Sequence, residues 1–341
     1  MNISILGSGG WGTALGLLLH GSGHEVTLWS KFQEEADTLR ETRQNRYLPG
    51  VTLPADLKFT ADLTCVENTE LVVLAVPSFA VRETFVAIRG ILPTETPVVI
   101  VSKGIERGTS KTFFEIGRDE LGTAQPLAIL SGPSHAEEVA RGVPTACVAA
   151  SDCTAIAELV QDIFMNERFR VYTSTDIIGV ELGGALKNII AVAAGIADGL
   201  GYGDNTSAAL MTRGLDEMAT LAVALGGTRE TLAGLTGLGD LIVTCTSKHS
   251  RNRRAGQFIG QGCTLEEAMD KVGAVVEGYY ATAAAIELAR PTGITMPIIE
   301  ELYLVLYEGK CPRVVLRDLM TRSKRAEYED AASGNWVLSD R

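Results

Sequence analysis

The sequence has few of the residues that build metal centres and disulfide frameworks. Its 341 residues include four histidines and six cysteines, and the cysteines form no C-x-x-C pair and no metal-ligand spacing with the histidines. That pattern is typical of an intracellular protein whose thiols stay reduced and mostly packed. We therefore expect no metal site and a cytoplasmic location.

An excess of positive charge is also missing. Thirty Lys and Arg against 42 Asp and Glu leave a formal net charge of −12, which argues against nucleic acid or an anionic membrane as a partner. No charge-free run is apolar enough to predict stable membrane insertion, and the first residues lack the features of a signal peptide. Any phosphate site must therefore be local.

The first thirty residues instead predict a nucleotide-binding fold. A short apolar strand runs into Gly7-Ser8-Gly9-Gly10-Trp11-Gly12, and a helix and a second strand are expected to follow. In this G-x-G-x-x-G setting Gly7 permits the tight turn, Gly9 lets the backbone approach a pyrophosphate, and Gly12 lets the helix pack on the sheet. The helix N-terminus supplies amides for the phosphates. We predict a dinucleotide cofactor.

The end of the second strand bears on which dinucleotide is used. The carboxylate that usually holds the ribose 2′-hydroxyl of NAD is missing there, and Ser30-Lys31 takes its place. Because a cation suits a 2′-phosphate, we expect NADP to be favoured or well tolerated, with NAD as the alternative. Glu34 and Glu35 can restore an NAD contact, although they look more like the acidic first turn of a helix.

Later apolar runs predict an α/β N-terminal Rossmann-like domain with a mainly parallel sheet, over residues 1–180. An all-α C-terminal domain is expected over 181–324, followed by a polar tail over 325–341. Ligands of such sheets bind beyond the carboxyl ends of the strands, where Lys103 and the Gly132-Pro133-Ser134 turn fall. A surface lysine and a structural turn are the alternative interpretations.

The strongest catalytic candidate is Lys187, the only charged residue in the apolar stretch 182–197. Apolar and very small residues on every side predict a helix that is buried all round. Burial disfavours the charged form of a lysine and lowers its pKa, so Lys187 can exchange a proton near neutrality. The alternative is a lysine whose stem packs while its amine reaches water.

Two stretches in the second half suggest a substrate site. Asp240 lies in a glycine-hinged turn, where it can orient a lysine, hold a substrate hydroxyl or simply cap the turn. The run Ser250-Arg251-Asn252-Arg253-Arg254 places three arginines at a helix start with Ser250 as its N-cap, which favours a phosphate site over a solvated basic patch.

Together these motifs resemble the bacterial NAD(P)-dependent glycerol-3-phosphate dehydrogenases, up to about residue 320. The resemblance implies reversible hydride transfer between the nicotinamide and C2 of dihydroxyacetone phosphate, which gives sn-glycerol 3-phosphate for phospholipid synthesis. It implies that Lys187 is the proton donor and acceptor. The substrate contacts that it implies are Lys103, Gly132, Ser134, Lys187, Asp240, Ser250, Arg251 and Asn252. The cofactor residues that it implies, besides Gly7, Gly9 and Gly12, are Gly10, Trp11, Lys31, Lys103, Ala136, Arg251, Val275 and Glu277.

Two rival hypotheses remain at this point. A dehydrogenase of another small hydroxy acid would share the two-domain plan but give no reason for the cluster at 250–254. A non-catalytic, nucleotide-sensing Rossmann module would not need Lys187 in a buried helix. The sequence leaves a monomer and a homodimer equally open.

Overall fold

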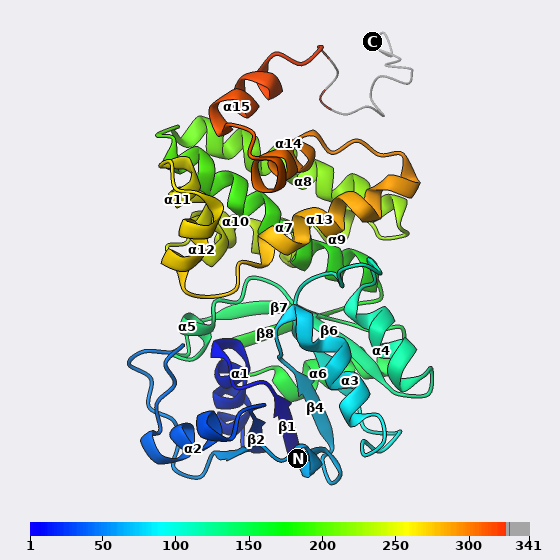
Figure 1. Cartoon of the computed structure of the whole chain (residues 1–341). Helices are drawn as coiled ribbons and strands as arrows, with labels where there is room; N and C mark the ends of the chain where they lie inside the picture. The colour runs from blue at the N-terminus through cyan, green and yellow to red at the C-terminus, as the bar shows by residue number, and fades with distance from the viewer. Residues whose placement is uncertain (325–326, 328–341) are drawn as a thin grey trace, which may run out of the picture.

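The structure is a computed structural model that describes residues 1–324 and 327, so the expected tail at 325–341 lies outside the described residues except for residue 327. It has a lower layer built on one sheet and an upper layer of helices (Figure 1). The sheet ends with β8 at Ser174 and the first long helix, α7, begins at Ile177. The boundary expected at 180 therefore falls just inside this helix.

The lower layer is an eight-stranded sheet in the order β3-β2-β1-β4-β5-β6-β7-β8. All neighbouring strands are parallel except β6 and β7, which are antiparallel, so the mainly parallel sheet is confirmed. The inner strands are buried on both faces because apolar helices cover each side. The strands are β1 (Asn2–Leu6), β2 (Glu25–Trp29), β3 (Lys58–Thr60), β4 (Leu71–Leu74), β5 (Val98–Ile100), β6 (Leu127–Ser131), β7 (Thr145–Ala150) and β8 (Phe169–Ser174).

The helices of the sheet domain form two separate apolar cores. Helices α1, α2, α5 and α6 contribute to the core on one face, and α3 and α4 contribute to the core on the other. Their bounds are α1 (Gly10–Gly21), α2 (Gln33–Thr42), α3 (Val81–Ile88), α4 (Phe113–Leu121), α5 (Ala136–Val139) and α6 (Thr154–Phe164), with short 3₁₀ turns η1 (Leu63–Val66) and η2 (Ser78–Ala80).

The upper layer is helical, with α7 at its centre. The Asp176 side chain caps α7 by accepting from the amide of Gly179. The layer contains α7 (Ile177–Gly199), α8 (Asp204–Ala224), α9 (Arg229–Ala233), α10 (Asp240–Thr246), α11 (Arg251–Gly260), α12 (Leu265–Val272), α13 (Glu277–Ala289), α14 (Pro297–Glu308), α15 (Pro312–Met320), the π-helical turn η3 (Leu235–Gly239) and the 3₁₀ turn η4 (Arg290–Thr292). The helical domain is confirmed.

Helices α7 and α11 cross so closely that their backbones are in contact, because glycines line the crossing. A Cβ atom on Gly195 would lie 2.0 Å from the carbonyl oxygen of Arg253, and one on Gly256 would lie 2.0 Å from that of Val192. No side chain fits there, so only glycine permits this approach. The crossing fixes the start of α11 beside the middle of α7.

Two helices of this layer begin in different ways. Thr264 forms a capping box with Glu267 at the start of α12. Gly203 is the N-cap of α8, and no side chain caps that helix.

Helix α7 is the one helix in the described part of the chain that is long and apolar enough to cross a membrane. Most of α7 is buried inside the helical domain, and its buried residues lie on all sides of the helix. Its apolar composition is therefore explained by its place in the core.

Candidate functional site

Two lysines share one buried carboxylate where the two layers meet. Asp240 Oδ1 accepts a hydrogen bond from Lys187 Nζ, and Asp240 Oδ2 lies 2.7 Å from Lys103 Nζ. Lys187 comes from the middle of α7, and Lys103 follows β5 at the carboxyl edge of the sheet. The Lys187 side chain is only 8% exposed, so the amine does not reach bulk water. The alternative of a lysine that extends its amine into solvent is therefore wrong.

Burial and charge shift the titration of this cluster. Burial lowers the pKa of Lys187 to about 8, against the opposing effect of the Asp240 charge. Burial would by itself raise the pKa of Asp240, but the charges of Lys103 and Lys187 outweigh it and hold that pKa below its usual range. The carboxylate therefore stays ionised while Lys187 exchanges a proton near neutrality.

Asp240 reaches the lysines through a helix rather than a loop. The glycine-hinged turn expected at 236–240 is instead the π-helical turn η3, which runs directly into α10 with Asp240 as its first residue. A Cβ atom on Gly237 would lie 1.9 Å from the carbonyl oxygen of Leu232, so the tight turn requires glycine there. Single π turns often occur at functional sites because they redirect a side chain.

Lys103 is held in place by the turn after β6. Its Nζ donates to the carbonyl oxygen of Gly132 at 2.9 Å and contacts Ser134 Oγ at 3.2 Å. Gly132 has a φ of +145°, a conformation that L side chains rarely adopt. The structure thus brings Lys103, Gly132, Ser134 and Asp240 together.

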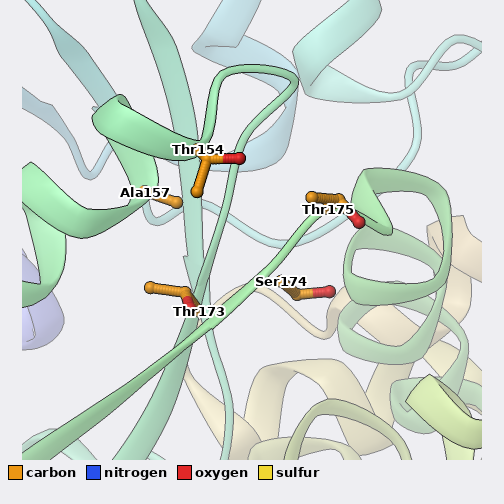
Figure 2. Close-up of a pocket in the computed structure, with 5 residues that line it drawn as sticks. All are labelled: Thr154, Ala157, Thr173, Ser174 and Thr175. Carbon is orange, nitrogen blue, oxygen red and sulfur yellow. The ribbon is translucent and has the colours of Figure 1, made fainter.

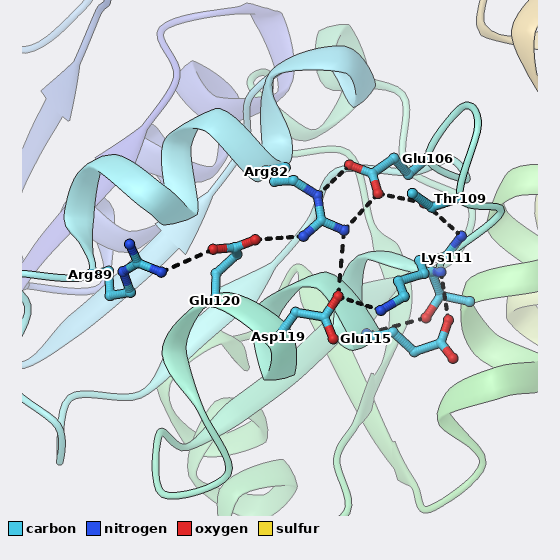
Figure 3. Close-up of polar contacts among 9 residues, drawn as sticks. Arg82, Arg89, Glu106, Thr109, Lys111, Glu115, Asp119 and Glu120 are labelled. Carbon is cyan, nitrogen blue, oxygen red and sulfur yellow. Dashed lines mark hydrogen bonds and ion pairs between the residues drawn. The ribbon is translucent and has the colours of Figure 1, made fainter.

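The loop that follows Lys103 is anchored by an ion-pair network on the sheet domain (Figure 3). Arg82 of α3 binds both oxygens of Glu106, which lies in that loop, and also binds Glu120 of α4. Lys111 pairs with Asp119 of α4 at 2.5 Å. These partly exposed pairs add little stability singly, but as a network they limit the movement of the loop behind Lys103.

The glycine turn after β1 fits the pyrophosphate of a dinucleotide. A Cβ atom on Gly9 would meet nothing within 4 Å, so space is free in front of this residue, whereas one on Gly12 would lie 2.0 Å from the carbonyl oxygen of Gly7. Helix α1 begins at Gly10 and has no side-chain cap, so its first amides are open to an anion. The indole Nε1 of Trp11 is buried and has no hydrogen-bond partner among the described residues.

Four more residues expected along the cofactor come from different parts of the chain. Ala136 begins α5, and its Cβ would be 3.6 Å from a Cβ atom on Gly10. Val275 is half-buried just before α13. Glu277 begins α13 and accepts from Ser78 Oγ at 2.7 Å, and burial raises its pKa. Lys31 is exposed at the end of β2, where it pairs with Glu83.

The arginine-rich helix start borders a cavity of about 530 Å³. Ser250 is the N-cap of α11 as expected, and its hydroxyl accepts from the amide of Arg253. Only two of the three arginines face the cavity, because Arg253 turns away to pair with Asp198 at 2.7 Å. The cavity is lined by Arg46, Tyr47, Glu137, Lys248, His249, Arg251, Arg254, Val272, Gly273 and Ala274. The interpretation of all three arginines as one phosphate seat is therefore wrong for Arg253.

Asn252 ties three helices together beside Lys187. Its Nδ2 donates to Asn188 Oδ1 of α7 at 2.8 Å, and its Oδ1 accepts from the amide of Gly278 of α13 at 2.9 Å. Within the described part of the chain no acceptor takes the second hydrogen of this amide group.

A second cavity, of about 310 Å³, lies away from this cluster (Figure 2). It is lined by Thr154 and Ala157 of α6, by Thr173 and Ser174 at the end of β8, and by Thr175, which follows that strand. It contains no charged side chain and none of the expected site residues, so it gives no support for a catalytic role.

Sequence reasoning missed two side chains of the cluster. Thr244 follows Asp240 by one helical turn, and its Oγ1 lies 3.0 Å from Lys187 Nζ. That spacing was a usable signal, because residues four apart share a helix face. His135 is near Lys187, and burial together with the positive charge of Lys187 lowers the pKa of His135. Its Nε2 is buried without a partner among the described residues, and its only signal was its place beside Ser134.

No three His, Cys, Asp or Glu side chains in the described part of the chain are grouped so that they could hold a metal ion. The fold presents a glycine turn that fits a pyrophosphate, a buried amine held by a carboxylate, and a cationic cavity at the start of α11. These features define a nicotinamide-dependent oxidoreductase with a Rossmann-like domain and a helical domain.

Comparisons with known proteins identify the family. The models of the NAD-dependent glycerol-3-phosphate dehydrogenase N-terminus and C-terminus match residues 2–157 and 176–317. A glycerol-3-phosphate dehydrogenase [NAD(P)+] of Moorella thermoacetica is 55% identical and covers 98% of this chain and 99% of its own; that of Fusobacterium nucleatum is 51% identical, covering 96% and 99%. The crystal structure of glycerol-3-phosphate dehydrogenase from Coxiella burnetii superimposes with a TM-score of 0.91 at 41% identity, covering 94% and 99%.

The chain belongs to the NAD-dependent glycerol-3-phosphate dehydrogenase family. The resemblance seen in the sequence, the oxidoreductase class and the use of NAD or NADP are confirmed. The rival hypotheses of another hydroxy acid dehydrogenase and of a non-catalytic module are set aside.

Proposed function

We propose that this chain interconverts dihydroxyacetone phosphate and sn-glycerol 3-phosphate in the cytoplasm and so supplies glycerol 3-phosphate for phospholipid synthesis. The observation that carries this proposal is the buried Lys187 amine, held by Asp240 beside a second ammonium. The relatives from Moorella and Fusobacterium, which match nearly the whole chain, support it. The first domain, which carries the cofactor, ends near residue 180, and the helical domain up to residue 324 carries most of the substrate site.

Lys187 is the proton donor and acceptor of the reaction. When bound, the reduced nicotinamide supplies the hydride that C2 of dihydroxyacetone phosphate receives. As C2 is reduced, negative charge develops on its oxygen, and Lys187 Nζ donates the proton that completes the hydroxyl. In the reverse direction the neutral amine takes that proton back. A pKa of about 8 suits both directions, because neither form of the amine is scarce near neutrality.

Asp240 and Lys103 prepare the place where this proton moves. Asp240 fixes the position of both amines and compensates their charge, so that two ammonium groups can lie together in a buried site. Lys103, held by Gly132 and Ser134, adds positive potential near the developing alkoxide.

The phosphate of the substrate is bound by the start of α11. Arg251 lines the cavity, Ser250 caps the helix, and Asn252, which donates one amide hydrogen to Asn188, has a second that no described residue accepts. Binding the phosphate there positions the distant carbonyl carbon against Lys187 and excludes misaligned poses.

The direct test is the loss of NADPH or NADH absorbance on addition of dihydroxyacetone phosphate. We expect turnover with the phosphorylated substrate and very little with dihydroxyacetone, which lacks the group that α11 binds. The substitution Arg251→Ala should raise the KM for dihydroxyacetone phosphate about tenfold or more, while kcat changes less. Equal turnover of both substrates by the wild-type enzyme would contradict the proposal, since the arginine-bearing cavity would then have no role.

A further inference from the structure

Glu35 occupies a position between the glycine turn and the end of β2. It is the third residue of α2, and its Oε2 accepts from Ser8 Oγ at 3.0 Å and from Ser30 Oγ at 2.5 Å. Ser8 lies inside the glycine turn, between Gly7 and Gly9, and Ser30 directly follows β2. Both serines are buried, so the carboxylate is held at a fixed place by two hydroxyl groups.

This place is where a Rossmann-like domain binds the adenosine ribose, because the ribose follows the pyrophosphate from the glycine turn toward the end of the second strand. A carboxylate only accepts hydrogen bonds, and no donor in the described part of the chain bonds to Glu35 Oε1. A ribose 2′-hydroxyl can donate to that oxygen, whereas a 2′-phosphate has no donor for it and carries charge of the same sign.

Lys31, just after the end of β2, favours a 2′-phosphate instead of a 2′-hydroxyl. Its amine pairs with Glu83 of α3 at 2.7 Å, and both side chains are more than half exposed. An exposed pair of this kind contributes little, so Lys31 can exchange Glu83 for a phosphate at low cost.

We infer that Glu35 binds the 2′-hydroxyl of NAD(H) while Lys31 binds the 2′-phosphate of NADP(H), so that two separate side chains allow this chain to accept both cofactors. The carboxylate comes from the first turn of α2 rather than from the strand end, which is why Ser30-Lys31 alone predicts a preference for NADP. The inference rests on cofactor use alone and does not depend on the substrate.

The test is a fluorescence titration of the free enzyme with NADH and with NADPH, without substrate. Glu35→Gln should raise the Kd for NADH about tenfold, because a charge-assisted hydrogen bond is lost, and should leave the Kd for NADPH unchanged or lower. Lys31→Ala should raise the Kd for NADPH and leave that for NADH unchanged. Glu34→Gln is the matched control, since its exposed side chain makes no hydrogen bond with the described residues, and neither Kd should change.

The inference is overturned if Glu35→Gln weakens the binding of NADH and NADPH equally, because Glu35 would then only stabilise the glycine turn. It is also overturned if the binding of neither cofactor is weakened. The melting temperature without cofactor shows whether each variant is folded. If Glu35→Gln fails to fold, Glu35→Asp takes its place, because it keeps the charge but shortens the side chain by one methylene. The inference then requires that Glu35→Asp lose affinity for NADH and keep its affinity for NADPH. Failure of this test leaves the turnover of dihydroxyacetone phosphate untouched, so it is distinguishable from failure of the proposed function.

Discussion

The two domains differ in what they bury. The buried polar side chains of residues 1–175 are hydroxyls and amides, such as Ser8, Ser30 and Asn45, and none is charged. The described part of the helical domain buries four side chains that carry a carboxyl or amino group, which are Glu181, Lys187, Glu217 and Asp240. The glycine turn of the sheet domain thus depends on backbone geometry, and the helical domain holds most of the buried groups that can titrate. We expect pH to affect the chemistry and stability of the helical domain more than cofactor binding.

The largest expected effect comes from the amine at the centre of the helical domain. Lys187→Ala should lower kcat about 10²-fold or more, because general acid catalysis is lost, while the Kd for NADH measured by fluorescence barely changes. Lys58→Ala, which removes an exposed lysine paired with Glu25, is the control and should behave as wild type. If Lys187→Ala raised KM and left kcat intact, Lys187 would hold the substrate rather than transfer the proton.

The glycine turn of the sheet domain should show the reverse behaviour. A Cβ atom on Gly9 meets nothing within 4 Å, and the residue has a φ of −64° that alanine adopts readily, so Gly9→Ala should melt at the wild-type temperature. The added methyl occupies the space needed for close approach of the pyrophosphate, so the Kd for both cofactors should rise about tenfold or more. Gly21→Ala, equally uncrowded but at the far end of α1, is the control. A large loss of stability in Gly9→Ala with normal affinity would contradict this role.

The contrast between the domains also explains how far the sequence could predict the site. The glycine turn and Lys187 were predicted because each lies in a contiguous stretch whose pattern is sufficient by itself. The sharing of Asp240 by two lysines was not predicted, since Lys103 and Asp240 are 137 residues apart in sequence and meet only in the folded chain, where α10 packs against α7. Glu35 was assigned mainly to a helix turn, because propensity does not show where a side chain points. The pairing of Arg253 with Asp198 was also not predicted, because it depends on the glycine-lined crossing of α7 and α11, which brings the two helices together.

The pH profile of the reaction sharpens the comparison further. Reduction needs the protonated amine, so kcat/KM for dihydroxyacetone phosphate should fall about tenfold per pH unit above about 8. Oxidation of glycerol 3-phosphate needs the neutral amine, so its rate should rise as the pH approaches 8 and level off above it. Asp240→Asn removes the charge that raises the pKa of Lys187, so the falling limb should move to lower pH. The Kd for NADH should stay nearly constant through this range. A limb that did not move in Asp240→Asn would mean that another group controls it.

The smallest expected effect concerns stability. Glu217 accepts from the amides of Ile298 and Ile299 at the start of α14, and burial raises its pKa to about 7. Between pH 4.5 and 7 the folded state keeps a proton that the unfolded state releases, so the stabilising contribution is present below this range and is lost as the pH rises through 7. Glu217→Gln still accepts from the same amides but cannot ionise; by urea unfolding it should match wild type at about pH 4 and be at least about 1 kcal/mol more stable at pH 8. Glu308→Gln, at an exposed position on the same helix, should show no such difference. A Glu217→Gln variant less stable than wild type at pH 8 would mean that the ionised carboxylate stabilises α14, and burial would then not control its titration.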